Sequence, residues 1–183
     1  MTTSLRSDAQ RNLDRILEAA ADAFAESGPD VTMDEIARRA GVGHGTVFRR
    51  FPTKDALRAA VIRLRINELL ARATELLDDP DAGAALEAFV WAGAEMCRRD
   101  RALFEGVEKC DGFADVMGVK HELHDTVDKL IRRARRAGAV RSRLDGQDLG
   151  ALVGAAIEAS LHAERPDAWK RYVRIVLAGL RAD

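Results

Sequence analysis

The chain is poor in cysteine, and this scarcity narrows the class of protein. Only Cys97 and Cys110 occur among its 183 residues, too few for the disulfide framework of a small secreted protein. No apolar run approaches the ~20 residues that a membrane-spanning helix needs, and the opening segment MTTSLRSDAQR lacks the apolar stretch of a signal peptide. These absences predict a protein that stays in the reducing cytoplasm without membrane contact.

An excess of charge of either sign is also missing. The 29 Lys and Arg residues nearly balance the 30 Asp and Glu residues, which leaves a net charge of −1 and a pI of about 6.4. Any nucleic-acid surface must therefore be a local patch on a near-neutral body. Hydrophobic residues make up 47% of the chain, enough for a real core in one or two compact units.

The motifs of common enzymes are absent too. There is no glycine-rich phosphate loop, no GxSxG elbow and no HExxH, so we expect no catalytic residues and no cofactor. A metal-responsive sensor stays an alternative, because His121 and His124 lie three apart on one helical face. The spacing of these histidines from Cys97 and Cys110 matches no zinc module, and we predict no metal site.

Prolines are few and fall where helices end. All four lie between segments whose apolar residues recur at helical spacing. They are Pro29, Pro52, Pro80 and Pro166. No strand-like alternation occurs, so the pattern predicts an all-α fold of about nine helices, over residues 8–27, 33–40, 44–50, 53–79, 81–99, 102–108, 123–138, 146–164 and 167–181. Gly112 and Gly118 should interrupt the pattern before the seventh helix.

The segment 31–54, VTMDEIARRAGVGHGTVFRRFPTK, predicts two short helices joined by a tight turn. Thr32 and Glu35 form a Thr-x-x-Glu capping box, in which each side chain accepts a hydrogen bond from a backbone N–H of the first turn. The first helix should therefore begin at Met33. It should end at Gly41, because glycine most easily takes the left-handed conformation that closes a helix.

The second helix, 44–50, has one buried and one outward face. Val47 and Phe51 lie four apart on the inward side, and the outward residues are His44, Thr46, Arg49 and Arg50. Residues 31–54 carry five basic residues against two acidic ones, a local charge of +3. This is helix-turn-helix geometry, in which a helix of this size enters the major groove and contacts base edges and phosphates. Thr53 should cap a third helix whose first residue, Lys54, meets a phosphate.

From about Arg15 to Val61 the sequence resembles the TetR family of bacterial transcriptional regulators, through ILEAAADAFAESGPDVTMDEIARRAGVGHGTVFRRFPTKDAL. The resemblance implies a dimeric, all-helical regulator whose C-terminal domain often binds a small-molecule inducer. It places His44, Gly45 and Thr46 in the recognition helix and Lys54 at a phosphate. In this chain Gly43 replaces the usual Ser or Thr cap, and Phe48 replaces a phosphate-binding Tyr. The predicted DNA-binding residues are Thr32, Met33, Gly43, His44, Gly45, Thr46, Phe48, Arg49, Arg50 and Lys54.

This resemblance divides the chain into a DNA-binding domain, 1–52, and a ligand-binding and dimerisation domain, 53–183. The last two helices are rich in apolar and small residues on more than one side, so each must be covered on more than one side. They could form the core of a monomer or, with a second subunit, a four-helix dimer interface. The resemblance favours the dimer. The residues predicted to form the dimer interface are Leu152, Ala156, Ala159, Tyr172, Ile175, Val176 and Gly179.

A ligand pocket is predicted among the middle helices, where aromatic and thioether side chains gather. The predicted lining residues are Phe89, Trp91, Met96, Phe104, Phe113, Met117, His121 and Leu123. Each also fits a plain core position. The sequence therefore predicts a repressor that binds a palindromic DNA operator as a homodimer and is released by a small apolar effector. The alternative is a DNA-binding dimer with no small-molecule inducer.

Overall fold

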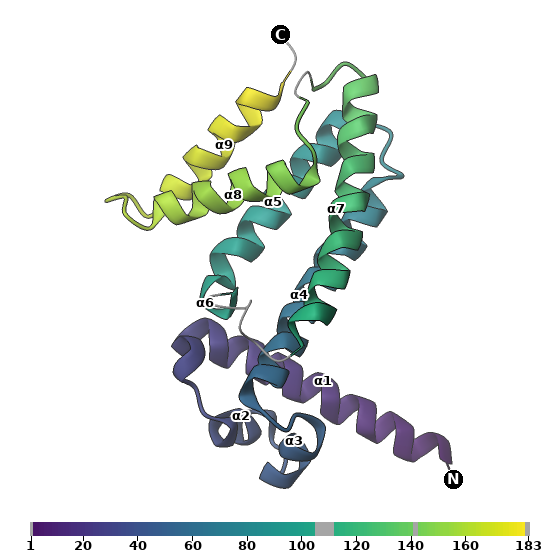
Figure 1. Cartoon of the computed structure of the whole chain (residues 1–183), viewed down its shortest axis with the longest axis vertical. Coiled ribbons are helices and arrows are strands. Elements are labelled where there is room, and N and C mark those ends of the chain that lie inside the picture. The colour runs from purple at the N-terminus through teal and green to yellow at the C-terminus, as the bar shows by residue number, and fades with distance from the viewer. Residues whose placement is uncertain (1, 105–111, 141–142, 182–183) are drawn as a thin grey trace. The chain divides into compact units, whose positions relative to one another are not determined.

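The computed structural model describes residues 2–104, 112–140 and 143–181 (Figure 1). Within these ranges the chain is helical, and the one β-type contact is an isolated bridge between Val140 and Arg181. The helices are α1 (Thr2–Ser27), the 3-10 helix η1 (Gly28–Asp30), α2 (Met33–Ala40), α3 (His44–Arg50), α4 (Lys54–Leu76), α5 (Ala82–Arg99), α6 (Arg101–Phe104), α7 (Phe113–Arg136), α8 (Gly146–Ser160) and α9 (Ala168–Leu180). The predicted all-α class is confirmed, and over the described ranges nine α-helices are present. None of these helices is both long and apolar enough to cross a bilayer.

The helices form two compact units. The first comprises Met1–Arg65 and Asp100–Met117, and the second comprises Ile66–Arg99 and Gly118–Asp183. Helices α4 and α7 each begin in the first unit and continue into the second. The boundary between these units differs from the predicted boundary at residue 53 between a DNA-binding and a ligand-binding domain. That functional division stays a prediction.

The first unit is built around α1. Ile16, Ala20 and Phe24 recur every four residues and are fully buried, so they form one apolar stripe along the helix. Helix α1 packs on α2 and on α6, and α2 and α3 contribute buried Ile36 and Val47 to this unit. The core of this unit therefore holds the two short helices of the helix-turn-helix.

The second unit contains α5, α8 and α9, and α8 packs on both of the others (Figure 1). On α8 the buried stripe is Leu149, Val153 and Ile157, again one residue per turn. Helix α8 starts with a capping box, in which Asp145 accepts from the Asp148 backbone N–H at 2.8 Å. Most of the residues predicted to form the dimer interface lie on the remaining surfaces of α8 and α9.

Several predicted helix ends were wrong. Helix α1 begins at Thr2 rather than near residue 8, since no proline or glycine interrupts residues 2–27. Helix α7 begins at Phe113 and includes Gly118, because a single exposed glycine costs a helix only about 1 kcal/mol. Helices α4 and α8 end three and four residues before their predicted ends. Helix α6 covers Arg101–Phe104, and the rest of predicted helix 102–108 lies outside the described residues.

Candidate nucleic-acid interface

The turn between α2 and α3 closes as its sequence predicts. Thr32 Oγ1 accepts from the Glu35 backbone N–H at 3.2 Å, which satisfies one unpaired donor of the first turn of α2. Gly41 ends α2 with φ 62° and ψ 38°, and the Val42 N–H donates to the Ala37 carbonyl at 3.1 Å. This is a Schellman closure. It turns the chain sharply enough for α3 to begin three residues later.

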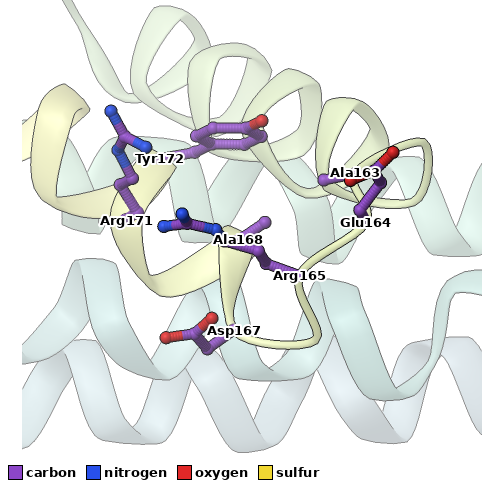
Figure 2. Close-up of a pocket in the computed structure, with 7 residues that line it drawn as sticks. All are labelled: Ala163, Glu164, Arg165, Asp167, Ala168, Arg171 and Tyr172. Atoms are coloured by element: carbon purple, nitrogen blue, oxygen red, sulfur yellow. The ribbon is translucent and has the colours of Figure 1, made fainter.

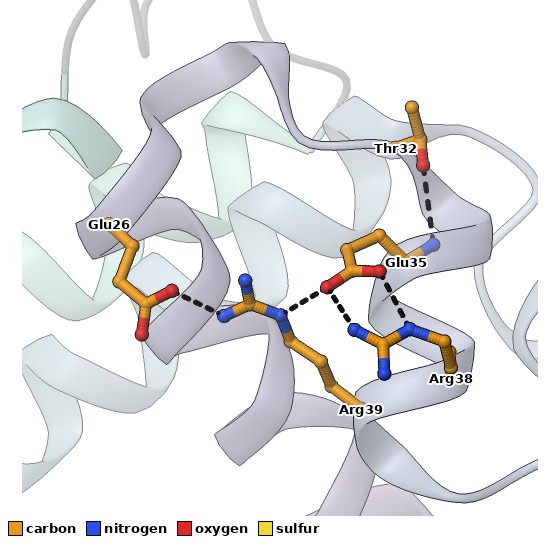
Figure 3. Close-up of polar contacts among 5 residues, drawn as sticks. All are labelled: Glu26, Thr32, Glu35, Arg38 and Arg39. Carbon is orange, nitrogen blue, oxygen red and sulfur yellow. Dashed lines mark hydrogen bonds and ion pairs between the residues drawn. The ribbon is translucent and has the colours of Figure 1, made fainter.

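The carboxylate of Glu35 binds two arginines instead of completing the predicted capping box (Figure 3). Arg38 donates to its two oxygens at 2.9 and 2.7 Å, and Arg39 donates to Oε1 at 2.7 Å. Arg39 also donates to Glu26 of α1 at 2.7 Å. The bonds from Arg38 and Arg39 lower the pKa of the Glu35 carboxyl from 4.5 to about 2. Arg38 and Arg39 are therefore both ion-paired within the protein.

Helix α3 has the two faces that its sequence predicts. Val47 is fully buried and Phe51 nearly so, and both face the core of the first unit. Most of the opposite side is exposed, namely His44, Gly45, Phe48, Arg49 and Arg50, with Thr46 half-buried. Arg49 Nε donates back to the Gly45 carbonyl at 3.1 Å. An exposed helix of seven residues with two arginines in its last turn has the size and charge to enter a major groove.

His44 is held by two neighbours. Its Nδ1 is hydrogen-bonded to Asp34 Oδ1 of α2, and its ring stacks on Phe48, with centroids 4.2 Å apart and 29° between the planes. The Phe48 position follows from the helical spacing of four residues. Asp34 was missed from the sequence, because a contact across ten residues and a turn leaves no local signal.

The residues on either side of the two short helices lie at helix N-termini. Thr53 Oγ1 accepts from the Ala56 N–H at 3.0 Å, and Lys54, half-buried, is the first residue of α4. Thr32 and Gly43 are exposed. Met33 is buried, so any contact of this residue with DNA would come from its backbone. The predicted contacts of these residues with DNA stay predictions.

The residues predicted for a dimer interface lie on α8 and α9. Leu152 is 46% exposed and Ile175 is 59% exposed, and both are among the most exposed large apolar residues described. Ala159 and Gly179 are exposed too, whereas Tyr172 and Val176 are half-buried and Ala156 is buried within the subunit. The exposed apolar side chains of α8 and α9 are available for the predicted dimer contact, which stays a prediction.

The residues predicted for a ligand pocket are divided between the two units. Phe104, Phe113 and Met117 belong to the first, and Phe89, Trp91, Met96, His121 and Leu123 to the second. Phe89 and Leu123 are buried, His121 is exposed and the other five are half-buried. Trp91 lies edge-on against Trp169 of α9, with ring centroids 6.0 Å apart.

Among the hollows that the described residues form, two lie on the second unit, and neither of these is lined by a residue of the predicted pocket. One, of about 390 Å³, lies at the connection of α8 and α9. Figure 2 shows its lining, which includes Arg165, Arg171 and Tyr172 beside Glu164 and Asp167. The other, of about 360 Å³, lies where Val140 and Arg181 meet the start of α5. Charged side chains line the first, unlike the apolar cavity that the sequence predicts.

Metal-ligating side chains do not gather in the part of the chain that the structure describes. No three His, Cys, Asp or Glu residues there could hold one ion together. Cys110, one of the four residues considered for a metal sensor, lies outside the described residues. The described residues therefore give no support to a metal-responsive sensor.

Two family models match the chain. The model of the bacterial regulatory proteins of the TetR family matches residues 16–61, and that of the C-terminal domain of SbtR-like transcriptional regulators matches residues 81–182. The first match contains the whole segment from the Thr32 cap to Lys54. The second begins at the N-terminal end of α5 and extends past α9.

Curated relatives and solved structures agree with these models. The HTH-type transcriptional repressor Rv3405c of Mycobacterium tuberculosis is 35% identical over 142 residues, 77% of this chain but only 64% of that protein, less than two thirds of its length. The uncharacterized regulator Rv2250c of the same species is 38% identical over 76% of this chain and 74% of its own length. A TetR transcription regulatory protein from Mycobacterium vanbaalenii has a TM-score of 0.75 at 37% identity, covering 97% of this chain and 99% of that one.

Proposed function

Because the chain belongs to the TetR family of bacterial transcriptional regulators, we propose that it is a repressor that binds a palindromic operator as a homodimer and is released by a small apolar ligand. Members of this family are DNA-binding regulators and not enzymes, in agreement with the missing enzyme motifs. The operator, the repressing action, the dimer and the ligand belong to the proposal.

The geometry of α3 carries this proposal. Val47 anchors the helix in the core, and on the opposite face His44, Gly45, Phe48, Arg49 and Arg50 are exposed while Thr46 is half-buried. Arg50 and Lys54, from the ends of two successive helices, supply positive charge for phosphates on either side of a contacted base. A helix presented in this way would place His44 and Thr46 toward base edges in the major groove.

The dimer is supported by the exposed residues of α8 and α9. Burying Ile175 and Leu152 against a second copy would remove from water the exposed half of two large apolar side chains, each contributing about 1 kcal/mol, roughly half of the value for full burial. A twofold dimer would set two copies of α3 against half-sites about 34–36 Å apart, one helical turn of DNA. Its operator would then be palindromic, as the protein is symmetric.

Release by a ligand is supported by the course of α4. This helix begins at Lys54, a predicted phosphate contact, and continues to Leu76 in the second unit. A ligand that has different affinities for two states of the protein, which differ in the orientation of α4, would shift the DNA-binding equilibrium. The coupling free energy between ligand and DNA binding in such systems is about 1–3 kcal/mol. A repressor function is further supported by the similarity to the M. tuberculosis repressor.

The test is a selection of bound fragments from genomic DNA, followed by footprinting of the best fragment. We expect a symmetric protected site with half-sites one turn apart and a protein mass of two chains in light scattering. Apolar metabolites chosen from the functions of neighbouring genes are then titrated onto the complex. Loss of DNA binding with one of them supports the effector. An asymmetric footprint or a single-chain complex would refute the dimer.

One observation favours a second function, a DNA-binding dimer without an inducer. Neither of these two hollows on the second unit is lined by a predicted pocket residue, and charged side chains line the first of them, which does not suit an apolar ligand. The titration separates the two functions, because the second one predicts full operator occupancy with every metabolite tested.

A further inference from the structure

His44, the first residue of α3, is exposed and yet held at two points. Its side chain is 58% exposed and that of Asp34 is 75% exposed, so neither is fixed by burial. Instead, Nδ1 is bound to the Asp34 carboxylate, and one face of the imidazole lies 4.2 Å from the Phe48 ring. Only Nε2 and the other ring face are left to approach a partner.

We propose that Asp34 is a positioning residue for sequence recognition, an inference that rests on the proposed DNA-binding function. Together with Phe48, Asp34 fixes the imidazole of His44 so that Nε2 alone contacts a base edge. Asp34 lies on α2, outside the recognition helix, and would not touch DNA itself. It would act through His44. The ligand of this site is one base pair in each half-site of the operator.

The carboxylate also sets which kind of hydrogen bond Nε2 can make. An ionised carboxylate only accepts, so Nδ1 must carry the donated proton. In a neutral imidazole Nε2 is then an acceptor, suited to the amino group of adenine or cytosine in the major groove. In an imidazolium Nε2 is a donor, suited to guanine N7 or O6. Without Asp34, either nitrogen of the neutral ring could carry the proton, and this restriction would be lost.

A bystander role for Asp34 makes the opposite prediction. Thr32, and not Asp34, caps α2, so the Asp34 carboxylate is not needed to begin the helix. An exposed carboxylate beside a DNA surface repels phosphates. If Asp34 only repelled phosphates, its removal would tighten binding to every sequence, whether or not His44 is present.

The test is a double-mutant cycle of Asp34→Ala and His44→Ala in the full chain. Affinities are measured for the selected operator and for its single-base variants, at one salt concentration. We expect either single variant to lose about tenfold of the preference at one base pair per half-site, as for the loss of one specific base contact. The double variant should lose no more than His44→Ala alone, because Asp34 acts through His44.

Further variants separate positioning from charge and from folding. Asp34→Asn keeps an accepting oxygen and should retain part of the base preference. Phe48→Tyr keeps the ring that stacks on His44 and should retain the whole base preference. Phe48→Leu removes this ring and should lower the base preference. Asp22→Ala removes the same charge from an exposed position on α1 in the same unit and should leave the preference unchanged. Circular dichroism will test whether each variant keeps its helix content.

Additive losses in the cycle, or tighter binding of Asp34→Ala to all sequences in both backgrounds, would overturn the positioning role. An unchanged base preference in Asp34→Ala would do the same. A wild-type protein that selects no duplex at all would overturn the proposed function, and the inference with it. These outcomes are distinguishable, because the wild-type selection is read before any variant.

Discussion

The strongest single test of the helix-turn-helix geometry is the replacement of Gly41 by alanine. Gly41 has φ +62°, a left-handed conformation that costs a residue with a Cβ about 1–2 kcal/mol. The added Cβ would also lie 2.5 Å from Arg15 Nη2. That arginine donates to the Gly41 carbonyl at 3.3 Å. Since the end of an arginine side chain can move away, the clash should cost only this exposed hydrogen bond, about 0.5–1 kcal/mol.

The sum is about 2 kcal/mol of unfolding free energy for Gly41→Ala. For a protein of this size it corresponds to a fall in melting temperature of about 4–8 °C. Urea unfolding followed by circular dichroism, at one protein concentration, measures the difference directly. Arg15→Ala, which loses the hydrogen bond but keeps the glycine, should lose only about 0.5–1 kcal/mol.

Gly45 provides a matched control four residues later. It lies inside α3, and a Cβ built there meets nothing within 4 Å. Alanine favours a helix interior over glycine by about 0.5–1 kcal/mol, so Gly45→Ala should stabilise the protein. Two glycines in one turn motif should thus respond with opposite sign. If Gly41→Ala unfolded at the wild-type urea concentration, the left-handed closure of α2 would be refuted.

Three further predictions concern Lys54, Ile175 and Glu35. Lys54→Ala should weaken binding to operator and random DNA alike. The slope of log affinity against log salt concentration should fall by about 0.9 per lost phosphate contact, measured by fluorescence anisotropy at several salt concentrations. A loss confined to the operator would contradict this prediction. Ile175→Asp places a charge in the predicted dimer interface, on a side chain that is 59% exposed in the single chain. Light scattering should then find a single-chain species, and circular dichroism should find its helicity unchanged. Glu35→Gln should lower stability at pH 7, since the ion pairs lower the folded pKa of Glu35 from 4.5 to about 2. That stabilisation is present above pH 4.5 and is lost as the pH falls through about 2, so the urea midpoints of the two proteins should converge there.

The local features of the motif could be predicted from sequence because their causes are local. Thr32 accepts a bond from a residue three positions on, and Gly41 is the one residue type suited to the conformation that ends α2. The bounds of α3 follow from Gly43 and from Phe51, which precedes a proline and is extended, with φ −132° and ψ 94°. Each of these signals lies within four residues of its effect.

The features that were missed join residues far apart in sequence. Arg39 bonds Glu26 across 13 residues, and His44 bonds Asp34 across ten. Arg58, buried on α4, donates to the Leu103 carbonyl at 2.8 Å across 45 residues, which ties α6 to the first unit. Charged residues at such separations have many possible partners, so no spacing rule selects one. The division into two units, with residues 100–117 in the first, was missed for the same reason.

The two short helices of the motif cannot be stable by themselves. Helices α2 and α3 have eight and seven residues, below the roughly 12–15 at which an isolated helix becomes even marginal in water. Their stability must come from packing, through Ile36 and Val47 in the core with Phe24 of α1. Polar contacts between helices add orientation, as when Arg39 bridges Glu35 and Glu26. The surface of α3 is therefore only as well ordered as α1 makes it, and a core change such as Phe24→Ala should weaken DNA binding without removing any residue near the DNA.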